Sequence, residues 1–199
     1  MAVTQSSSPV EADEPADQRV YLHDVPWSHY EILLAVKGEA PVPRIAYLEG
    51  ELELMSPSAH REMIKSRIRQ LIDAYAAHRG LDLWPVGSWT VRSAPAQRGV
   101  EPDECYTIGD PLTKRVPDLA IEVVWTRGGI DKLDIYRGLG VGEVWFWREG
   151  RIDAHVLRDG RYQQSGVSLV VAGLDLQLVA RLATASPTEA LAELRKSWA

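Results

Sequence analysis

Two acidic residues followed by a lysine form the most specific chemical pattern in this sequence. Asp103 follows Pro102, Glu122 lies inside an apolar run over 117–125, and Lys132 comes ten positions after Glu122. Two carboxylates can share a divalent cation, which polarises a phosphate and generates a hydroxide, while a fixed ammonium offsets the charge that grows on the phosphorane. The pattern therefore favours phosphodiester hydrolysis, with Asp103 and Glu122 as metal ligands and Lys132 as the stabilising cation.

Glu122 lies on a predicted strand whose side chains alternate between two faces. Leu119, Ile121 and Val123 predict a core-facing side, and an acid on the other side of so apolar a strand is costly unless it is paired or bound to metal. Asp118 shares the face of Glu122 but stands about 13 Å from it, at roughly 3.3 Å per residue. Because that separation is too large for two ligands of one cation, we expect Asp118 to be a turn residue or a supporting group.

The separation along one strand does not limit Asp103, because Asp103 lies on a different predicted strand. Neighbouring strands are only about 4.8 Å apart, so its carboxylate could lie close to that of Glu122. The alternative for Asp103 is a simple Pro-Asp turn.

Lys132 belongs to a short predicted helix, where a lysine is often just solvated. Its helical neighbours Ile135 and Tyr136 form the packed side, so its aliphatic stem should lie against the protein.

Other polar residues offer weaker alternatives. His60 stands at the start of a long predicted helix, where a structural or capping role competes with contact to a substrate phosphate or water, and the roles of Glu51 and Glu53 stay open. Cys105 has no nearby histidine and predicts a buried thiol. The histidines and the cysteine show no zinc spacing, and there is no phosphate-binding glycine loop. A basic cluster on the long helix could follow a phosphate backbone but is typical of a solvated face: Arg61, Lys65, Arg67 and Arg69.

The composition predicts one globular domain. A chain of 199 residues with 45% apolar and 25% charged residues suits a single core. Residues 1–20 are acidic and rich in Ser and Pro, which predicts a disordered tail before a domain over 21–199. The tail holds much of the net charge of −6, so that charge does not exclude a nucleic-acid partner. With no membrane-length apolar run, no secretory signal and one cysteine, we expect a cytoplasmic protein.

Helical and alternating patterns interleave along the chain. Helices are predicted over 27–37 (capped by Ser28, with Ile32, Leu33 and Val36 on one face), 59–79, 130–137 and 187–196. Strands are predicted as a hairpin over 45–55, around 81–84 and 88–92, at Asp103 and Glu122, over 143–147, and as a hairpin over 152–165. The expected fold class is α/β (α+β), a mixed sheet flanked by helices.

Several of these segments together resemble the Uma-two family of restriction endonucleases, a branch of the PD-(D/E)xK nuclease superfamily. The resemblance covers about 27–176 and rests on Glu49-Gly50-Glu51-Leu52, Met55-Ser56-Pro57, His60, Pro102-Asp103, Pro117-Asp118-Leu119 with Glu122-Val123-Val124, Lys132 with Tyr136, and Gly140 to Trp145. It implies a restriction-endonuclease-like sheet and DNA as the substrate. It also implies a Mg²⁺ (or Mn²⁺) site with Asp103 and Glu122 as ligands.

The resemblance also assigns further roles. His60, Asp118 and Tyr136 become possible substrate or supporting residues. Val124 occupies the position where the superfamily places its lysine, two residues after the acid, and Lys132 on the following helix takes over that charge. Cutting duplex DNA would favour a homodimer that presents two sites. The alternatives are a catalytically silent binding or scaffold protein that retains the fold, and a metal-dependent hydrolase of RNA or a small phosphodiester.

Overall fold

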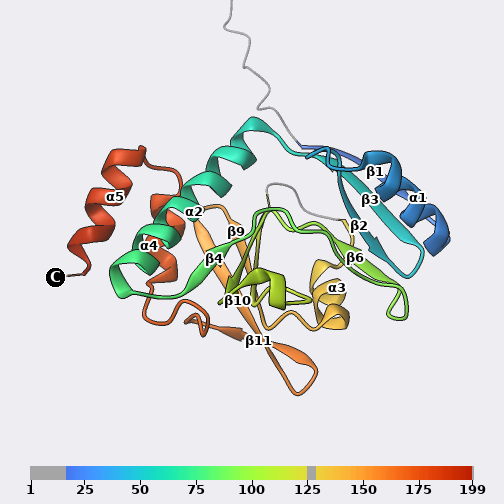
Figure 1. Cartoon of the computed structure of the whole chain (residues 1–199). Helices are drawn as coiled ribbons and strands as arrows, with labels where there is room; N and C mark the ends of the chain where they lie inside the picture. Colours follow the sequence, from blue (N-terminus) through green and yellow to red (C-terminus); the bar gives the residue numbers. More distant parts are fainter. Residues whose placement is uncertain (1–16, 125–128, 199) are drawn as a thin grey trace, which may run out of the picture.

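The computed structural model describes residues 17–124 and 129–198, which form two sheets and five α-helices (Figure 1). The helices are α1 (Trp27–Lys37), α2 (Ala59–Arg79), α3 (Lys132–Leu139), α4 (Leu176–Leu182) and α5 (Pro187–Lys196), with a short 3-10 helix over Pro111–Thr113. The first sheet has the order β1-β3-β2-β6-β5, and the second has the order β11-β10-β9-β8-β7-β4. The strands are β1 (Gln18–Leu22), β2 (Arg44–Leu48), β3 (Glu51–Ser56), β4 (Leu83–Pro85), β5 (Val91–Ser93), β6 (Arg98–Val100), β7 (Glu104–Ile108), β8 (Leu119–Val123), β9 (Glu143–Arg148), β10 (Arg151–Arg158) and β11 (Arg161–Ser165).

The second sheet is the predicted mixed sheet. Its strands β8 and β9 run parallel and are joined through α3, whereas the other pairs in this sheet are antiparallel. The first sheet is antiparallel throughout and carries the N-terminal hairpin. The predicted α+β fold class is therefore confirmed, with two sheets rather than one.

The alternation along β8 places its residues in two separate cores. Leu119, Ile121 and Val123 are buried in a cluster with side chains of α2, α4 and α5, as the sequence predicts. Ala120, on the other face, belongs to a cluster formed by α3, the neighbouring strand β9, and strands β2 and β6 of the first sheet. Helix α3 thus packs between the two sheets, and this position brings its first turn to their junction (Figure 1).

Most predicted helices and hairpins are confirmed, and their ends have clear causes. The Ser58 side chain accepts from the Arg61 backbone N–H at the start of α2, and Gly80 ends that helix in the left-handed conformation. Ser186 caps α5 in the same way as Ser58. Helix α4 was not predicted. It begins inside the apolar stretch over 167–180. The Asp175 side chain caps its first turn by accepting hydrogen bonds from the backbone N–H groups of Gln177 and Leu178.

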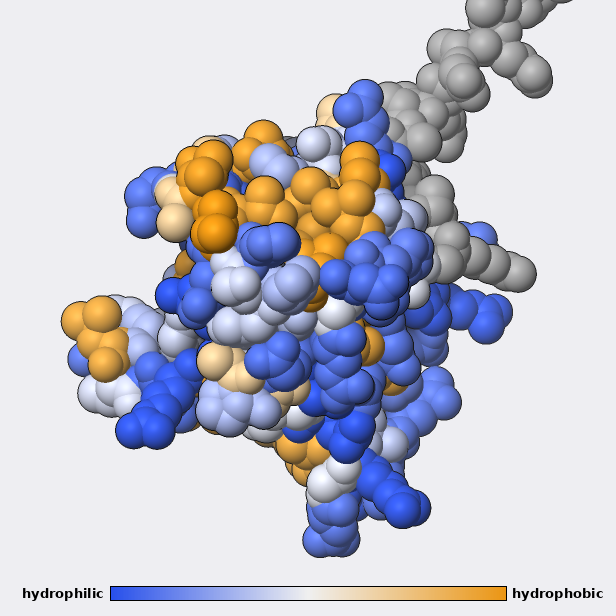
Figure 2. Space-filling view, turned by 90° about the vertical axis from the view of Figure 1, so that its right-hand side faces the viewer, coloured by the Kyte–Doolittle hydropathy of each residue, from blue (hydrophilic) through white to orange (hydrophobic). Residues whose placement is uncertain are grey.

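Helix α1 differs from the prediction in its cap and its buried face. Pro26 precedes the helix and no side chain caps it, so the Ser28 cap is wrong. Ile32 and Val36 are exposed, because the helix instead turns Tyr30 inward to stack on Tyr47 with ring centroids 5.1 Å apart. The side of the molecule that carries α1 and β1 shows an apolar area bordered by hydrophilic residues (Figure 2).

Several predicted boundaries move. Strand β1 starts at Gln18 and pairs with β3, so residues 18–20 belong to the first sheet and not to the predicted tail; residues 1–16, where the rest of that tail was predicted, lie outside the described part of the chain. Helix α3 runs from Lys132 through Gly138 to Leu139, because Gly138 is a packing residue: a Cβ there would lie 2.1 Å from the Arg98 side chain. The strands predicted around 81–84 and 88–92 begin later, at Leu83 and Val91.

In the described residues, no helix has the length and apolarity needed to cross a membrane.

Candidate active site

A cavity of about 350 Å³ lies where the two sheets and the first turn of α3 meet. Its wall combines acidic and basic side chains from distant parts of the sequence. They include Arg19 of β1, Glu53 of β3, Arg61 of α2, Glu122 of β8, Lys132 of α3 and Arg148 of β9. The cavity wall includes two of the three predicted catalytic residues, Glu122 and Lys132.

Glu122 is fully buried and held by two residues of α3. Its Oε2 accepts from Lys132 Nζ at 2.6 Å, and its Oε1 accepts from the Tyr136 hydroxyl at 2.6 Å. Lys132 and Tyr136 are four residues apart on the helix, so both point to the same side. Burial, followed by the charge of Glu122, raises the pKa of Tyr136 well above its ordinary value. The phenol therefore stays protonated at neutral pH and donates to the carboxylate.

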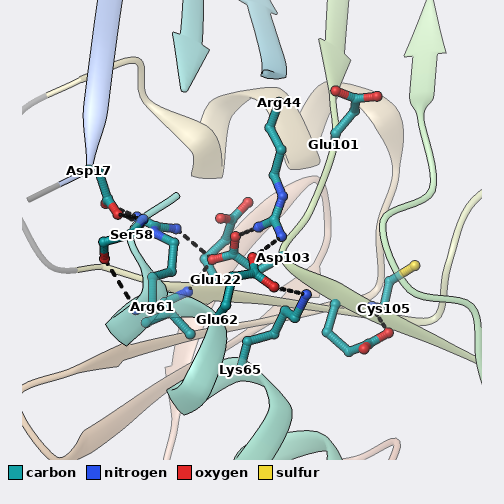
Figure 3. Close-up of polar contacts among 12 residues, drawn as sticks. Asp17, Arg44, Ser58, Arg61, Glu62, Lys65, Glu101, Asp103, Cys105 and Glu122 are labelled. Carbon is teal, nitrogen blue, oxygen red and sulfur yellow. Dashed lines mark hydrogen bonds and ion pairs between the residues drawn. The ribbon is translucent and has the colours of Figure 1, made fainter. Parts of the chain in front are cut away.

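Asp103 is equally buried but has different partners. Because Glu104, the first residue of β7, pairs with Ile121 of β8, Asp103 lies immediately before β7 and beside Glu122. Its Oδ2 accepts from Arg61 Nη1 at 2.6 Å and from the Val123 backbone N–H at 2.7 Å. Its Oδ1 forms an ion pair with Arg44. Figure 3 shows the two guanidinium groups converging on Asp103. Asp103 is not among the described residues that line the cavity.

The two arginines at Asp103 are themselves buried. Arg61 is 1% exposed and also pairs with Asp17 at 2.9 Å, while Arg44 is 6% exposed and pairs with Glu62 at 2.5 Å. The interpretation of Arg61 as part of a solvated basic face is therefore wrong. The first turn of α2 carries this side chain inward because Asp17 and Asp103 supply the two negative charges that a buried guanidinium requires.

The remaining predicted residues lie outside the cavity wall. Asp118 accepts from the Ile108 backbone N–H at 2.7 Å and from Lys114 Nζ, which anchors the turn before β8. His60 is half-buried in the first turn of α2 and is absent from the described lining. Cys105 is a buried thiol, as predicted; burial raises its pKa to about 12, which makes it a poor nucleophile.

Glu53 is the cavity residue that the sequence left unassigned. It is 3% exposed, and its charge attracts Arg19 of β1, which lines the same cavity. Gly129, with φ of 111°, makes room for it, because a Cβ at that position would lie 2.8 Å from Glu53 Oε2. The available signal was an acid between Leu52 and Leu54 on a predicted hairpin strand. Only the packing of the two sheets shows that this acid faces the cavity that Glu122 lines.

A divalent cation fits this cavity through its carboxylates. The described residues contain no group of three or more His, Cys, Asp and Glu side chains arranged to hold a metal. Mg²⁺ commonly uses only one or two carboxylates together with waters and substrate phosphates. Glu122 and Glu53 supply such oxygens in the cavity wall. The roles of Asp103 and Glu122 as ligands stay predictions. Arg44, Arg61 and the Val123 amide contact the oxygens of Asp103, and Lys132 and Tyr136 contact those of Glu122.

The sequence between residues 27 and 187 matches the Uma2 family, which is described as "Putative restriction endonuclease". The chain belongs to the Uma2 family. No curated protein sequence matches this Uma2 chain. Its structure is similar to a crystal structure of "a putative nuclease belonging to DUF820" from Anabaena variabilis ATCC 29413, with 16% sequence identity and a TM-score of 0.49. That similarity covers 76% of the Uma2 chain and 92% of the other chain.

Proposed function

We propose that this Uma2 chain is a metal-dependent endodeoxyribonuclease and that the cavity around Glu122 is its active site. The observation that carries the proposal is the buried Glu122 carboxylate, bound by Lys132 and Tyr136 in a wall that also holds Arg61 and Arg148. A phosphodiester brings negative charge, and the cations of the wall match that charge. The carboxylates supply hard oxygen ligands for Mg²⁺ or Mn²⁺.

Each side chain has a distinct role in this proposal. Glu122, with Asp103 as the predicted second ligand, would hold a Mg²⁺ or Mn²⁺ ion, which would supply Lewis-acid activation of the phosphate and of a water molecule. Tyr136 and Lys132 fix the orientation of the Glu122 carboxylate. Lys132 is 15% exposed, so its ammonium can also stabilise charge on a phosphate in the cavity. Arg61, held in place by Asp103 and Asp17, binds a non-bridging phosphate oxygen.

The position of Lys132 supports its assignment as the displaced superfamily lysine. Val124, two residues after Glu122, lines the same cavity as Lys132. A lysine at either position could therefore bring its ammonium to the same space. Lys132 Nζ lies 2.6 Å from Glu122. In this proposal, Lys132 on α3 therefore supplies the positive charge that Val124 cannot supply.

Cleavage of supercoiled plasmid tests the proposal. Wild-type protein should nick or linearise DNA with Mg²⁺ or Mn²⁺ and lose that activity with EDTA, and Glu122→Gln should be inactive. Glu143→Gln is the matched control, because Glu143 is a buried glutamate on the adjacent strand that binds Trp145 and two loop amides. Metal-independent cleavage, or full activity in Glu122→Gln, would contradict the proposed site. Single-stranded DNA and RNA substrates in parallel assays decide the substrate class.

The second candidate is a catalytically silent binding protein with a nuclease fold. The observation that favours it is the double ion pair of Asp103 with Arg44 and Arg61, which occupies a predicted metal ligand. In that case a gel-shift assay should show DNA binding while the plasmid stays intact at every metal concentration. We further propose that an active enzyme cuts duplex DNA as a homodimer, which light scattering with and without a DNA duplex would test.

A further inference from the structure

A second hollow, of about 430 Å³, adjoins the cavity around Glu122. We call it the β1 pocket. Its wall consists of Tyr21 of β1, His23 just after that strand, Leu48 of β2, Glu51 of β3 and the segment 129–131. The same segment, 129–131, also lines the cavity around Glu122. Because the two hollows share this wall, one ligand can extend from the cavity into the β1 pocket.

The first sheet sets the distance between the two hollows. Alternate residues of a strand point to the same face, so Arg19 and Tyr21 lie on one side of β1. Arg19 lines the cavity and Tyr21 lines the β1 pocket, and on the paired strand β3 Glu53 and Glu51 divide in the same way. Two residues along a strand span about 7 Å. One nucleotide of a nucleic-acid strand can cover that distance.

The two hollows differ in charge. Four cationic side chains line the cavity: Arg19, Arg61, Lys132 and Arg148. Among the residues that the structure describes, no lysine or arginine lines the β1 pocket. Its charged groups are the exposed carboxylates of Glu51 and Asp131, and the His23 ring contacts the first of these. The cavity therefore attracts a phosphate, whereas the β1 pocket repels one.

The side chains of the β1 pocket suit a flat ring that carries N–H groups. Tyr21 is 40% exposed and offers an aromatic surface on which a nucleobase can stack, and Leu48 and Ile130 add apolar contacts. Carboxylates accept hydrogen bonds and do not donate them. Glu51 and Asp131 therefore favour a base with an amino group, such as adenine or cytosine, over thymine, which presents carbonyl oxygens.

We propose that the β1 pocket binds an unpaired nucleobase of the substrate, next to the phosphate in the cavity around Glu122. This inference rests on the proposed function, because that function places the phosphate in the cavity. A base inside a duplex is stacked and paired, so it enters a pocket only from a single strand or after turning out of the helix. The favoured substrate is therefore DNA with an unpaired, amino-bearing base beside the scissile bond.

Fluorescence anisotropy with three labelled single-stranded probes tests the pocket: oligo-dA, oligo-dT and an abasic oligonucleotide of the same length. Ca²⁺ replaces Mg²⁺ in these titrations, and a gel verifies that the probes stay intact. The variants are Tyr21→Ala and Glu51→Gln. Trp84→Ala is the control for Tyr21→Ala, because Trp84 is an aromatic residue of the edge strand β4 and is 47% exposed. Glu193→Gln is the control for Glu51→Gln, because both glutamates are ion-paired and about half exposed, at 50% and 49%.

Wild-type protein should bind oligo-dA most tightly and the abasic probe least tightly. Tyr21→Ala should weaken binding of oligo-dA by about fivefold to a hundredfold, because one stacked base is lost, and should leave binding of the abasic probe unchanged. Glu51→Gln should reduce the preference for oligo-dA over oligo-dT, because an amide can donate to the carbonyl oxygens of thymine. Both control variants should bind like wild type.

The inference fails if Tyr21→Ala binds oligo-dA like wild type, or if it loses the same affinity for oligo-dA and for the abasic probe. Metal-dependent plasmid cleavage by the wild type would then show that the proposed function still stands. Wild-type protein that binds no probe and cleaves no plasmid would overturn both. If circular dichroism shows that Tyr21→Ala is unfolded, Tyr21→Leu replaces it, because leucine keeps apolar bulk without an aromatic face.

Discussion

Asp103, immediately before β7, and Glu122 of the neighbouring strand β8 are two buried carboxylates with different surroundings. Asp103 is bound by two arginines that are themselves buried, and it is not among the described residues that line the cavity. Glu122 is bound by one lysine and one tyrosine, and it lines the cavity. The two carboxylates are therefore alike in burial and differ in the cations beside them and in whether they line the cavity.

The difference has a chemical basis. Arginine keeps its charge and its planar fork, so a buried arginine pair is a permanent structural link. Lysine is a compact point charge on a flexible stem, and the 15% exposure of Lys132 lets it move between the carboxylate and a phosphate. The Asp103 side should therefore control stability, and the Glu122 side should control chemistry.

Asp103→Ala should have the largest effect, a loss of about 3–5 kcal/mol in the free energy of unfolding, because it leaves Arg44 and Arg61 buried without their common anion. Glu122→Ala should cost less, about 1–3 kcal/mol, because Lys132 can turn toward the cavity. Urea denaturation of both variants measures the difference. Equal losses for the two variants would show that the two carboxylates are energetically alike and would break the comparison.

Lys132→Ala should reduce cleavage by roughly a hundredfold or more while folding and metal binding persist, since removing one preorganised stabiliser costs about 3–4 kcal/mol. Lys114→Ala is the control, because Lys114 pairs with Asp118 away from the cavity. Adding Val124→Lys to Lys132→Ala should restore part of the rate from the other wall of the cavity. Undiminished cleavage by a folded Lys132→Ala protein would remove this lysine from the mechanism.

Tyr136→Phe should lower stability by about 1.5–3 kcal/mol, because it removes a hydrogen bond to a charged, buried carboxylate. Tyr162→Phe provides the comparison: its hydroxyl donates to the neutral Val141 carbonyl, so its loss should cost only about 0.5–1.5 kcal/mol. Thermal melts give the stabilities, and kcat/KM should fall only in Tyr136→Phe. An equal effect of the two changes on kcat/KM would mean that Tyr136 does not orient Glu122.

Asp118→Asn should have the smallest effect, less than about 1 kcal/mol in stability, because its pair with Lys114 is partly exposed. Cleavage should stay close to wild type, in contrast with Asp103→Asn, which loosens Arg61. Parallel plasmid assays and melts compare the two variants. Should Asp118→Asn abolish cleavage while Asp103→Asn stays active, the wrong acid has been placed near the site.

The sequence by itself determined the local structure around the site. The period of apolar residues and the Ser58 and Gly80 caps define α2, and the alternation along β8 separates Leu119 and Ile121 from Glu122. These signals are local because backbone geometry repeats every 3.6 or every two residues. The spacing of Lys132 and Tyr136 on one short helix likewise indicated a common face, and both side chains reach Glu122.

Only the tertiary structure decided which charges meet. Arg61 contacts Asp103 across 42 residues of sequence, and Glu53 reaches the cavity of Glu122 from the other sheet. Periodicity tells which way a side chain points from its own element, but it carries no information on what another element places opposite. For this Uma2 chain, the packing of α3 between the sheets turned Glu122 toward open space, and the inward turn of Arg61 and Arg44 enclosed Asp103.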